Sequence, residues 1–168
     1  MSEPWSYETS RELARTSGVE GLQHAADIFL VKGASAGRED EGPIAFRTAH
    51  VNVADDGQGA VPDWVIRPLR KRPGNPFPER FSVGRAPNCD VVLRFRFVSK
   101  LHAHIFESDS KLVLADNGSA NGTWVNGIIA PARERIPLRA GDEVRFGIIT
   151  MTVMAPPTLF ALLVGAPN

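Results

Sequence analysis

The segment that most constrains the fold of this chain runs from Asn117 to Gly127 and reads Asn-Gly-Ser-Ala-Asn-Gly-Thr-Trp-Val-Asn-Gly. It holds three Asn-Gly pairs in eleven residues. Asn-Gly takes positive φ at both centres of a tight turn more readily than other dipeptides, so it is the strongest short-range signal for a β-hairpin. The β-forming run 123–125 lies between two of these turns. The segment therefore predicts shaped loops on a β scaffold.

Short β-type runs with turn residues between them extend from Trp64 to Met154. Short strands at this spacing, with no helical period between them, favour a sandwich or barrel over a parallel βαβ sheet. We therefore predict an all-β domain. Its expected strands cover 64–69, 80–83, 91–93, 102–107, 111–115, 123–125, 135–138, 143–146 and 150–154, with a hairpin across 108–110.

The N-terminal part of the chain has a different pattern. Apolar residues recur at helical spacing over about 18–32, which predicts an amphipathic helix there. Thr9 and Glu12 match a capping box at a helix start. Residues 1–63 hold eleven acids and five bases, a net charge of −6, whereas the remainder holds eight acids and fourteen bases, a net charge of +6. The asymmetry indicates an acidic extension beside an anion-receptive domain, or simply two solvated surfaces of unlike composition.

The C-terminal tail is apolar but short. Its core, Leu159–Val164, is far shorter than the roughly 20 residues that a transmembrane helix needs. We expect it to pack on the protein itself, with contact to a partner as the alternative. No membrane association is predicted. The N-terminus has no signal-peptide pattern, so the expected location is cytoplasmic.

Other function classes find little support. The lone Cys89 offers no intrachain disulfide, and no Cys/His cluster has metal-ligand spacing, so we expect neither a metal nor a cofactor. Ser99 and His102 lack a nucleophile elbow and an orienting acid, so we expect no enzyme and no catalytic residues. The basic half lacks aromatic residues clustered among its cations, so no nucleic-acid partner is expected.

Several motifs follow one another at fixed spacing over about 64–154, just over half of the chain. The motifs are Gly84-Arg85, Ser99-x-x-His102-Ala103, Asp116-x-x-Ser119-x-Asn121-Gly122-Thr123-x-Val125-Asn126-Gly127 and Leu138-x-x-Gly141-Asp142-x-Val144-x-Phe146-Gly147. Together they resemble the forkhead-associated (FHA) domain. The resemblance implies an eleven-stranded β-sandwich whose loops at one end bind phosphothreonine peptides.

The resemblance assigns the ligand contacts to five positions. A phosphothreonine carries nearly two negative charges and three strong acceptor oxygens. Arg85 can meet it with a planar cationic fork, Ser99 with a hydroxyl and Lys100 with a second cation. Asn121 resembles the family Asn that hydrogen-bonds the peptide backbone. Ala120 stands where the family often has Thr, so one hydroxyl contact worth about 0.5–1.5 kcal/mol is in doubt.

A second group of residues is expected to support the site. Gly84 would let the backbone bend before Arg85, and His102 resembles the family's buried His, which braces the loop carrying Ser99. Asn126 and Gly127 are expected to fix a turn. Arg94 and Arg96 either compensate for the hydroxyl that Ala120 lacks, set a preference for acidic residues around the phosphothreonine, or are solvated strand residues. The supporting set is Gly84, His102, Gly122, Thr123, Asn126 and Gly127.

The predicted organisation is an acidic extension (1–62), an FHA domain (63–155) and an apolar tail (156–168). The expected function is phosphothreonine-peptide binding in signalling, with a phosphothreonine-containing protein as partner and a Ser/Thr kinase upstream. The alternative is a phosphorylation-independent FHA scaffold for protein assembly. A further hypothesis is self-association, in which phosphorylated Thr9, Thr16 or Thr48 of the extension docks on Arg85 in cis or in a neighbouring molecule.

Overall fold

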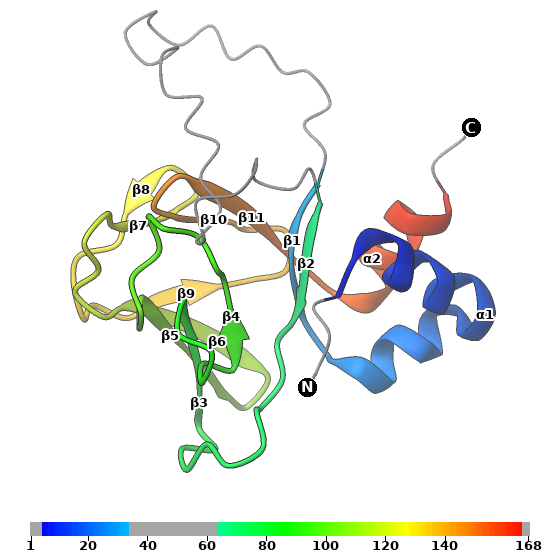
Figure 1. Cartoon of the computed structure of the whole chain (residues 1–168), viewed down its shortest axis with the longest axis horizontal. Coiled ribbons are helices and arrows are strands. Elements are labelled where there is room, and N and C mark those ends of the chain that lie inside the picture. The colour runs from blue at the N-terminus through cyan, green and yellow to red at the C-terminus, as the bar shows by residue number, and fades with distance from the viewer. Residues whose placement is uncertain (1–4, 34–63, 166–168) are drawn as a thin grey trace, which may run out of the picture.

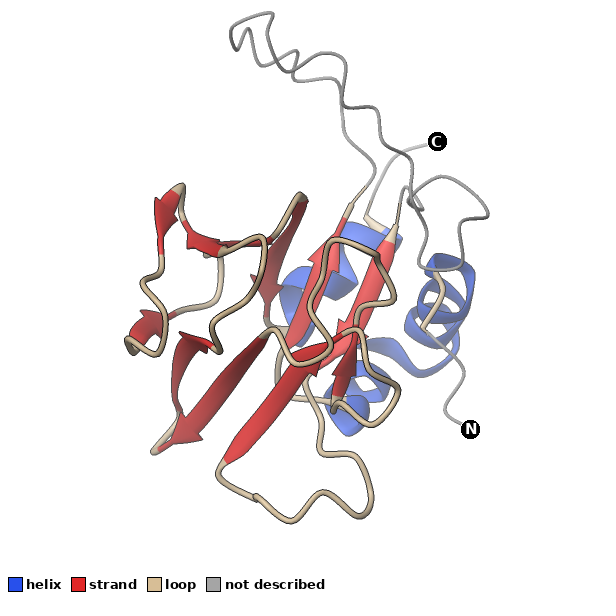
Figure 2. Cartoon of the chain, turned by 60° about the vertical axis from the view of Figure 1, so that its left-hand side comes forward, coloured by secondary structure: helices blue, strands red, loops and turns tan. Residues whose placement is uncertain are grey.

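The computed structural model describes residues 5–33 and 64–165 of the chain. These residues form two β-sheets packed face to face, with two helices against the outer face of one sheet (Figures 1 and 2). The six-stranded sheet has the order β2-β1-β11-β10-β7-β8, and the five-stranded sheet has the order β4-β3-β5-β6-β9. Neighbouring strands are antiparallel except for the parallel pair β3 and β4. The arrangement confirms the predicted β-sandwich.

The strands of the six-stranded sheet are β1 (Phe29–Lys32), β2 (Val65–Pro68), β7 (Thr123–Val125), β8 (Ile128–Ile129), β10 (Glu143–Phe146) and β11 (Ile149–Met154). Those of the five-stranded sheet are β3 (Arg80–Gly84), β4 (Val91–Val92), β5 (Ala103–Ser108), β6 (Lys111–Asp116) and β9 (Ile136–Leu138). The helices are α1 (Tyr7–Ala25) and α2 (Pro156–Val164).

The main core lies between the sheets. Along β11, Ile149, Met151 and Val153 are buried while the residues between them are half-buried, as a strand with one face on a core requires. These side chains join Ile105 and Leu114 of the opposite sheet in one cluster. The alternation along β11 therefore marks the face of this strand that is turned toward the core.

Two tight hairpins follow from local chemistry. Asn126 and Gly127 have φ of 50° and 79°, and Val125 pairs with Ile128 across them. Positive φ at both centres is the geometry that makes Asn-Gly turns match the strand twist. The predicted hairpin between β5 and β6 is also present, with positive φ at Asp109 and Ser110.

The predicted helix over 18–32 is wrong in its second half. Helix α1 instead spans Tyr7–Ala25, with Ser6 rather than Thr9 as its N-cap and a kink at Gly18, where φ is 62°. Residues Phe29–Lys32 form strand β1, which pairs with β2 and β11. This short run is buried on both faces, so its apolar residues fit a helix period and a central strand equally well. Backbone pairing on two sides decides for the strand.

Helix α2 forms from the apolar tail and packs with α1 on the outer face of β1, β2 and β11 (Figure 1). Leu159 and Leu163 of α2 and Leu22 of α1 are buried there, against Phe29 and Ile66 of the sheet. The tail therefore packs on the protein, as expected. Among the described residues, neither helix has the length and apolar character needed to cross a membrane.

The division of the chain at residues 62 and 155 stays a prediction. The segment predicted as the extension contributes β1 to the sandwich. Thr9 and Thr16 lie within α1, where the hydroxyl of Thr16 donates to the Glu12 carbonyl at 2.9 Å. Thr48 falls outside the described residues.

Candidate functional site

Three loops meet at one end of the sandwich: 85–90 after β3, 93–102 before β5, and 117–122 between β6 and β7. The backbone N–H of Arg85 donates to the Ser99 carbonyl at 2.9 Å, which joins the first loop to the second. The backbone N–H of Ala120 donates to Ser99 Oγ at 3.0 Å, which joins the third loop to the second. Ser99 therefore connects all three loops, and the structure brings Arg85, Ser99 and Ala120 together.

Gly84 supports this junction through its missing side chain. A Cβ at this position would lie 2.3 Å from the Lys100 carbonyl oxygen, well inside van der Waals contact. Its φ is not in the left-handed region, so the predicted bend before Arg85 is not what requires glycine. Glycine is needed because the backbone carrying Ser99 and Lys100 approaches the end of β3 so closely.

His102 braces two of the loops from inside the protein. Its Nδ1 accepts the backbone N–H of Ser99 at 3.0 Å, and its Nε2 lies 3.0 Å from the Gly122 carbonyl oxygen. Since Nδ1 accepts, the ring proton sits on Nε2, which donates to Gly122. The side chain is fully buried and packs edge-on against Phe146. This geometry is that of a neutral structural histidine.

The electrostatics agree with that assignment. Burial lowers the pKa of His102, although the hydrogen bond to Gly122 and the Asp116 carboxylate, 4.0 Å from Nε2, act in the opposite direction. The imidazole is therefore neutral near pH 7 and its tautomer is set by its two partners.

Asp116, at the end of β6, organises the third loop. Its carboxylate accepts from the Ser119 hydroxyl at 2.6 Å, the Ser119 backbone N–H at 2.9 Å and the Thr123 hydroxyl at 2.6 Å. Burial would raise the pKa of Asp116, but these donors lower it overall, so the carboxylate stays charged. Ser119 Oγ in turn accepts the Gly122 N–H at 3.0 Å.

This network holds the loop that presents Asn121. Asp116 and Ser119 are part of the third sequence motif, but no role is predicted for them from the sequence. The signal was available, because Asp followed closely by Ser and Gly is typical of a side chain that hydrogen-bonds the backbone ahead of it. Thr123 and Gly122 belong to the same network.

Asn121 is exposed at the tip of the third loop. Its side-chain N–H2 donates to the Phe97 carbonyl at 2.8 Å, which fixes the plane of the amide. The following Gly122 has φ of 83°, and a Cβ there would lie 2.8 Å from the ring of Trp124. Glycine at 122 is therefore required for both conformation and space.

Arg85 is half-buried, and its Nε donates to the Val98 carbonyl at 3.1 Å. This bond anchors the guanidinium beside the second loop. Lys100 is exposed one residue beyond Ser99. The guanidinium of Arg85 and the hydroxyl of Ser99 thus lie at one loop junction, and Lys100 follows Ser99 directly in the chain.

Asn126 and Gly127 lie elsewhere. They form the turn at the opposite end of β7 from the loop carrying Asn121. Asn126 Oδ1 accepts the Glu143 N–H at 2.9 Å, and its amide donates to Asp142 at 3.1 Å. They fix a turn, as expected, but they do not adjoin the three loops.

Known proteins share this part of the chain. Residues 81–147 match the family model of the FHA domain. The chain is 33% identical over 76 residues to the oxoglutarate dehydrogenase inhibitor of Corynebacterium efficiens, a match over 45% of this chain and 51% of that protein. It is 34% identical over 79 residues to the glycogen accumulation regulator GarA of Mycobacterium tuberculosis, covering 45% of each. It therefore spans about half the length of these relatives.

Two further known proteins are similar to this chain. The FHA domain-containing protein PS1 of Arabidopsis thaliana is 34% identical over 67 residues, which cover 39% of this chain and 4% of that protein. The FhaA FHA domain, solved in complex with an intracellular domain, is 28% identical with a TM-score of 0.44, over 60% of this chain and 94% of the solved one. The family-model match and the curated relatives thus show that residues 81–147 of this chain are similar to the forkhead-associated (FHA) domain.

Proposed function

We propose that the three-loop end of the sandwich binds a phosphothreonine peptide. The observation that carries this proposal is the hydrogen bond from the Ala120 N–H to Ser99 Oγ. A hydroxyl carries a single hydrogen, so an oxygen that accepts from the protein can direct that hydrogen to a ligand. The same loop junction holds the guanidinium of Arg85, and the two groups together suit a phosphate.

In this proposal some residues bind the phosphate and another binds the peptide backbone. Arg85 neutralises the phosphate, Ser99 donates its hydroxyl hydrogen to a phosphate oxygen, and Lys100 adds a cation. Asn121 uses one amide hydrogen on Phe97, and its oxygen and second hydrogen pair with the peptide backbone. Ala120 offers only its backbone, which is already bonded to Ser99. The chain then acts as a non-catalytic interaction module downstream of a Ser/Thr kinase, in keeping with the FHA resemblance.

A titration of phosphopeptides tests the proposal. We expect a phosphothreonine peptide to bind the wild type and its unphosphorylated form to bind far less well. Arg85→Ala should weaken binding roughly 10- to 100-fold, because hydrogen bonds to charged groups contribute about 1.5–3 kcal/mol. A phosphoserine peptide should bind less well than phosphothreonine, because the resemblance implies a small pocket for the threonine methyl group.

The matched control is Arg145→Gln. Arg145 stacks on the ring of Trp124 at 3.6 Å and lies on β10, in the middle of the six-stranded sheet. The Arg145→Gln variant should bind the phosphothreonine peptide with the same affinity as the wild type. Equal binding of phosphorylated and unphosphorylated peptides, unchanged by Arg85→Ala, would instead support the phosphorylation-independent scaffold.

Docking of the N-terminal extension on the same site is a hypothesis within this proposal. Thr9 and Thr16 are helical in α1, whereas a backbone read by Asn121 must be extended, so their docking requires part of α1 to unfold. If removing residues 1–60 leaves the phosphopeptide affinity and oligomeric state of the kinase-treated protein unchanged, this hypothesis fails.

A further inference from the structure

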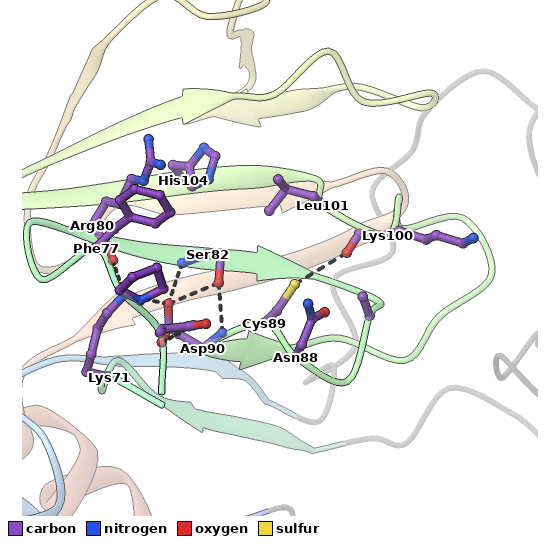
Figure 3. A pocket seen from close by; sticks show the side chains of 13 residues that line it. Lys71, Phe77, Arg80, Ser82, Asn88, Cys89, Asp90, Lys100, Leu101 and His104 are labelled. Carbon is purple, nitrogen blue, oxygen red and sulfur yellow. Dashed lines mark hydrogen bonds and ion pairs between the residues drawn. The ribbon is translucent and has the colours of Figure 1, made fainter. Parts of the chain in front are cut away.

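A pocket of about 530 Å³ lies on the outer face of the five-stranded sheet, away from the core. Figure 3 shows Phe77, Arg80 and His104 at one end of it and Lys100 at the other. The 70–79 loop, the exposed side of β3 and β5, and the 85–90 loop form its walls. His104 is the residue two places beyond His102 in the chain. The structure separates them: His102 faces the core and His104 lines this pocket.

The base of the pocket is preorganised by Asp90. Its side chain is 0% exposed and accepts from Lys71 Nζ, Asn75 Nδ2 and both the N–H and hydroxyl of Ser82, at 2.7–3.0 Å. The backbone N–H of Arg72 also donates to it, at 2.7 Å. Burial would raise the pKa of Asp90, but these donors lower it overall. The carboxylate is ionised, saturated and shielded, so it repels an incoming anion little.

The accessible charges of the pocket are positive. Arg80 stacks over Phe77 at 4.0 Å, and Lys71 and Lys100 also line the walls. Glu79 is an acid close to Arg80: its carboxylate lies 3.9 Å from Arg80 Nε and its side chain is 57% exposed, so solvent weakens that pair. Burial lowers the pKa of His104, and the nearby charges of Arg80 and Lys71 lower it further, against a smaller opposite effect of Asp90.

Apolar surface accompanies these cations. Phe77 is 48% exposed and Leu101 is 38% exposed, although both are large apolar residues. An exposed aromatic ring next to stacked cationic groups is a common anchor in protein interfaces. The pocket therefore suits a ligand that presents carboxylates together with an apolar side chain.

The pocket is continuous with the candidate phosphate site. Lys100 follows Ser99 directly, and Ala86 follows Arg85; both line the pocket. The Ala86 N–H donates to the Lys100 carbonyl at 3.1 Å, and Cys89 Sγ lies 3.3 Å from the same oxygen. The backbone that forms one end of the pocket is thus the backbone that positions Arg85 and Ser99.

We infer that this pocket is a second binding site for the same partner, and that it takes an acidic segment with an apolar residue near the phosphothreonine. The inference rests on the proposed function, because the phosphate site is what brings the partner to this face. Arg80 is the principal contact for a carboxylate, and Phe77 and Leu101 contact the apolar side chain. Acidic partners are selected over neutral ones by charge complementarity.

Synthetic peptides test this inference. A phosphothreonine peptide with Ala and Gln flanks is compared with the same peptide extended by Glu-Glu-Leu-Glu through a Gly-Ser spacer, on its amino or its carboxyl side. We expect one extension to tighten binding roughly fivefold, as a favourable pair of partly exposed charges does, and to lose that gain as ionic strength rises. Ring resonances of His104 should shift only with the extended peptide.

The variants separate this inference from the proposed function. Arg80→Gln should abolish the gain and leave the neutral peptide bound as before, since the backbone carbonyl of Arg80 still accepts from Lys71. Arg145→Gln should keep both the gain from the acidic extension and the affinity for the neutral peptide. A gain that is absent in the wild type, or equal in Arg80→Gln, overturns the inference while the proposed function stands. Failure of every peptide to prefer its phosphorylated form overturns the proposed function, and this inference with it.

Discussion

The outer faces of the two sheets differ in polarity and in what packs against them. Phe29, Val31 and Ile66 make the outer face of the six-stranded sheet apolar, and α1 and α2 cover it with a second apolar cluster. The corresponding face of the five-stranded sheet carries Arg80 and His104, and within residues 5–33 and 64–165 no helix packs against it (Figure 2). A sheet face with large apolar side chains must be covered, whereas a polar one is free to bind ligands. The strand sequences thus determine which side of the sandwich is available for binding.

The largest expected effect is on the covered face. Leu159→Ala should lower the free energy of unfolding by about 2–5 kcal/mol, because it opens a cavity in a fully buried cluster. Denaturation in urea measures the loss, and phosphopeptide affinity of the folded protein should not change. Val164→Ala, on the same helix but 41% exposed, is the control and should stay within about 0.5 kcal/mol. Weaker peptide binding by folded Leu159→Ala would show that the two faces are coupled.

The open face should respond to the loss of one buried charge. Asp90→Asn keeps the size of the side chain but turns an N–H2 group toward donors, so it should lower the free energy of unfolding by about 1–3 kcal/mol. It should also remove the gain from the acidic peptide extension, because the 70–79 loop loses its anchor. Glu107→Gln, an acid-to-amide change at an exposed position of β5, is the control. An unchanged stability for Asp90→Asn would mean that the network contributes nothing net.

The smallest expected effect is on the pH dependence of the free energy of unfolding. It should arise from two histidines at and next to β5 of the five-stranded sheet. His102 and His104 both have pKa values lowered by burial, so the folded state disfavours their protonation. Their neutral forms stabilise the protein fully above the unfolded pKa of about 6.5, and this contribution is lost as the pH falls from there toward the folded pKa. Stability should therefore fall below about pH 6.5, before carboxylates titrate.

His104→Gln sharpens that test. Removing His104 should flatten the decline in stability below pH 6.5 without abolishing it, because His102 still titrates. The free energy of unfolding from urea titrations at several pH values provides the measurement. If stability declines identically in His104→Gln and in the wild type, His104 does not contribute to the pH dependence.

Much of the fold could be predicted because its signals are local. The Asn126-Gly127 turn needs only the dihedral preferences of two residues, and the alternation along β11 needs only one buried face. The loops that bear Arg85, Ser99 and Asn121 were likewise indicated by short motifs. Their meeting at one end of the sandwich follows from the order of the strands between them.

Other features depended on partners far away in the chain. Phe29–Lys32 is compatible with a helix until β11 and β2 supply hydrogen bonds on both sides. Gly84 matters because the Lys100 carbonyl approaches it, which no local rule reveals. The Asp90 network joins residues 8 to 19 positions apart, so the pocket above it could not be predicted from spacing.

By itself, the sequence determined the β-sandwich, the tight turns and the presence of residue types that suit a phosphate, since dihedral preference, side-chain period and fixed charge are properties of the residues themselves. Only the tertiary structure decided which apolar run became β1, which histidine faces the core, and that Asp90, whose side chain is 0% exposed, underlies a cationic pocket. Those outcomes depend on burial and hydrogen bonding between distant segments, and these energies exist only once the chain has folded.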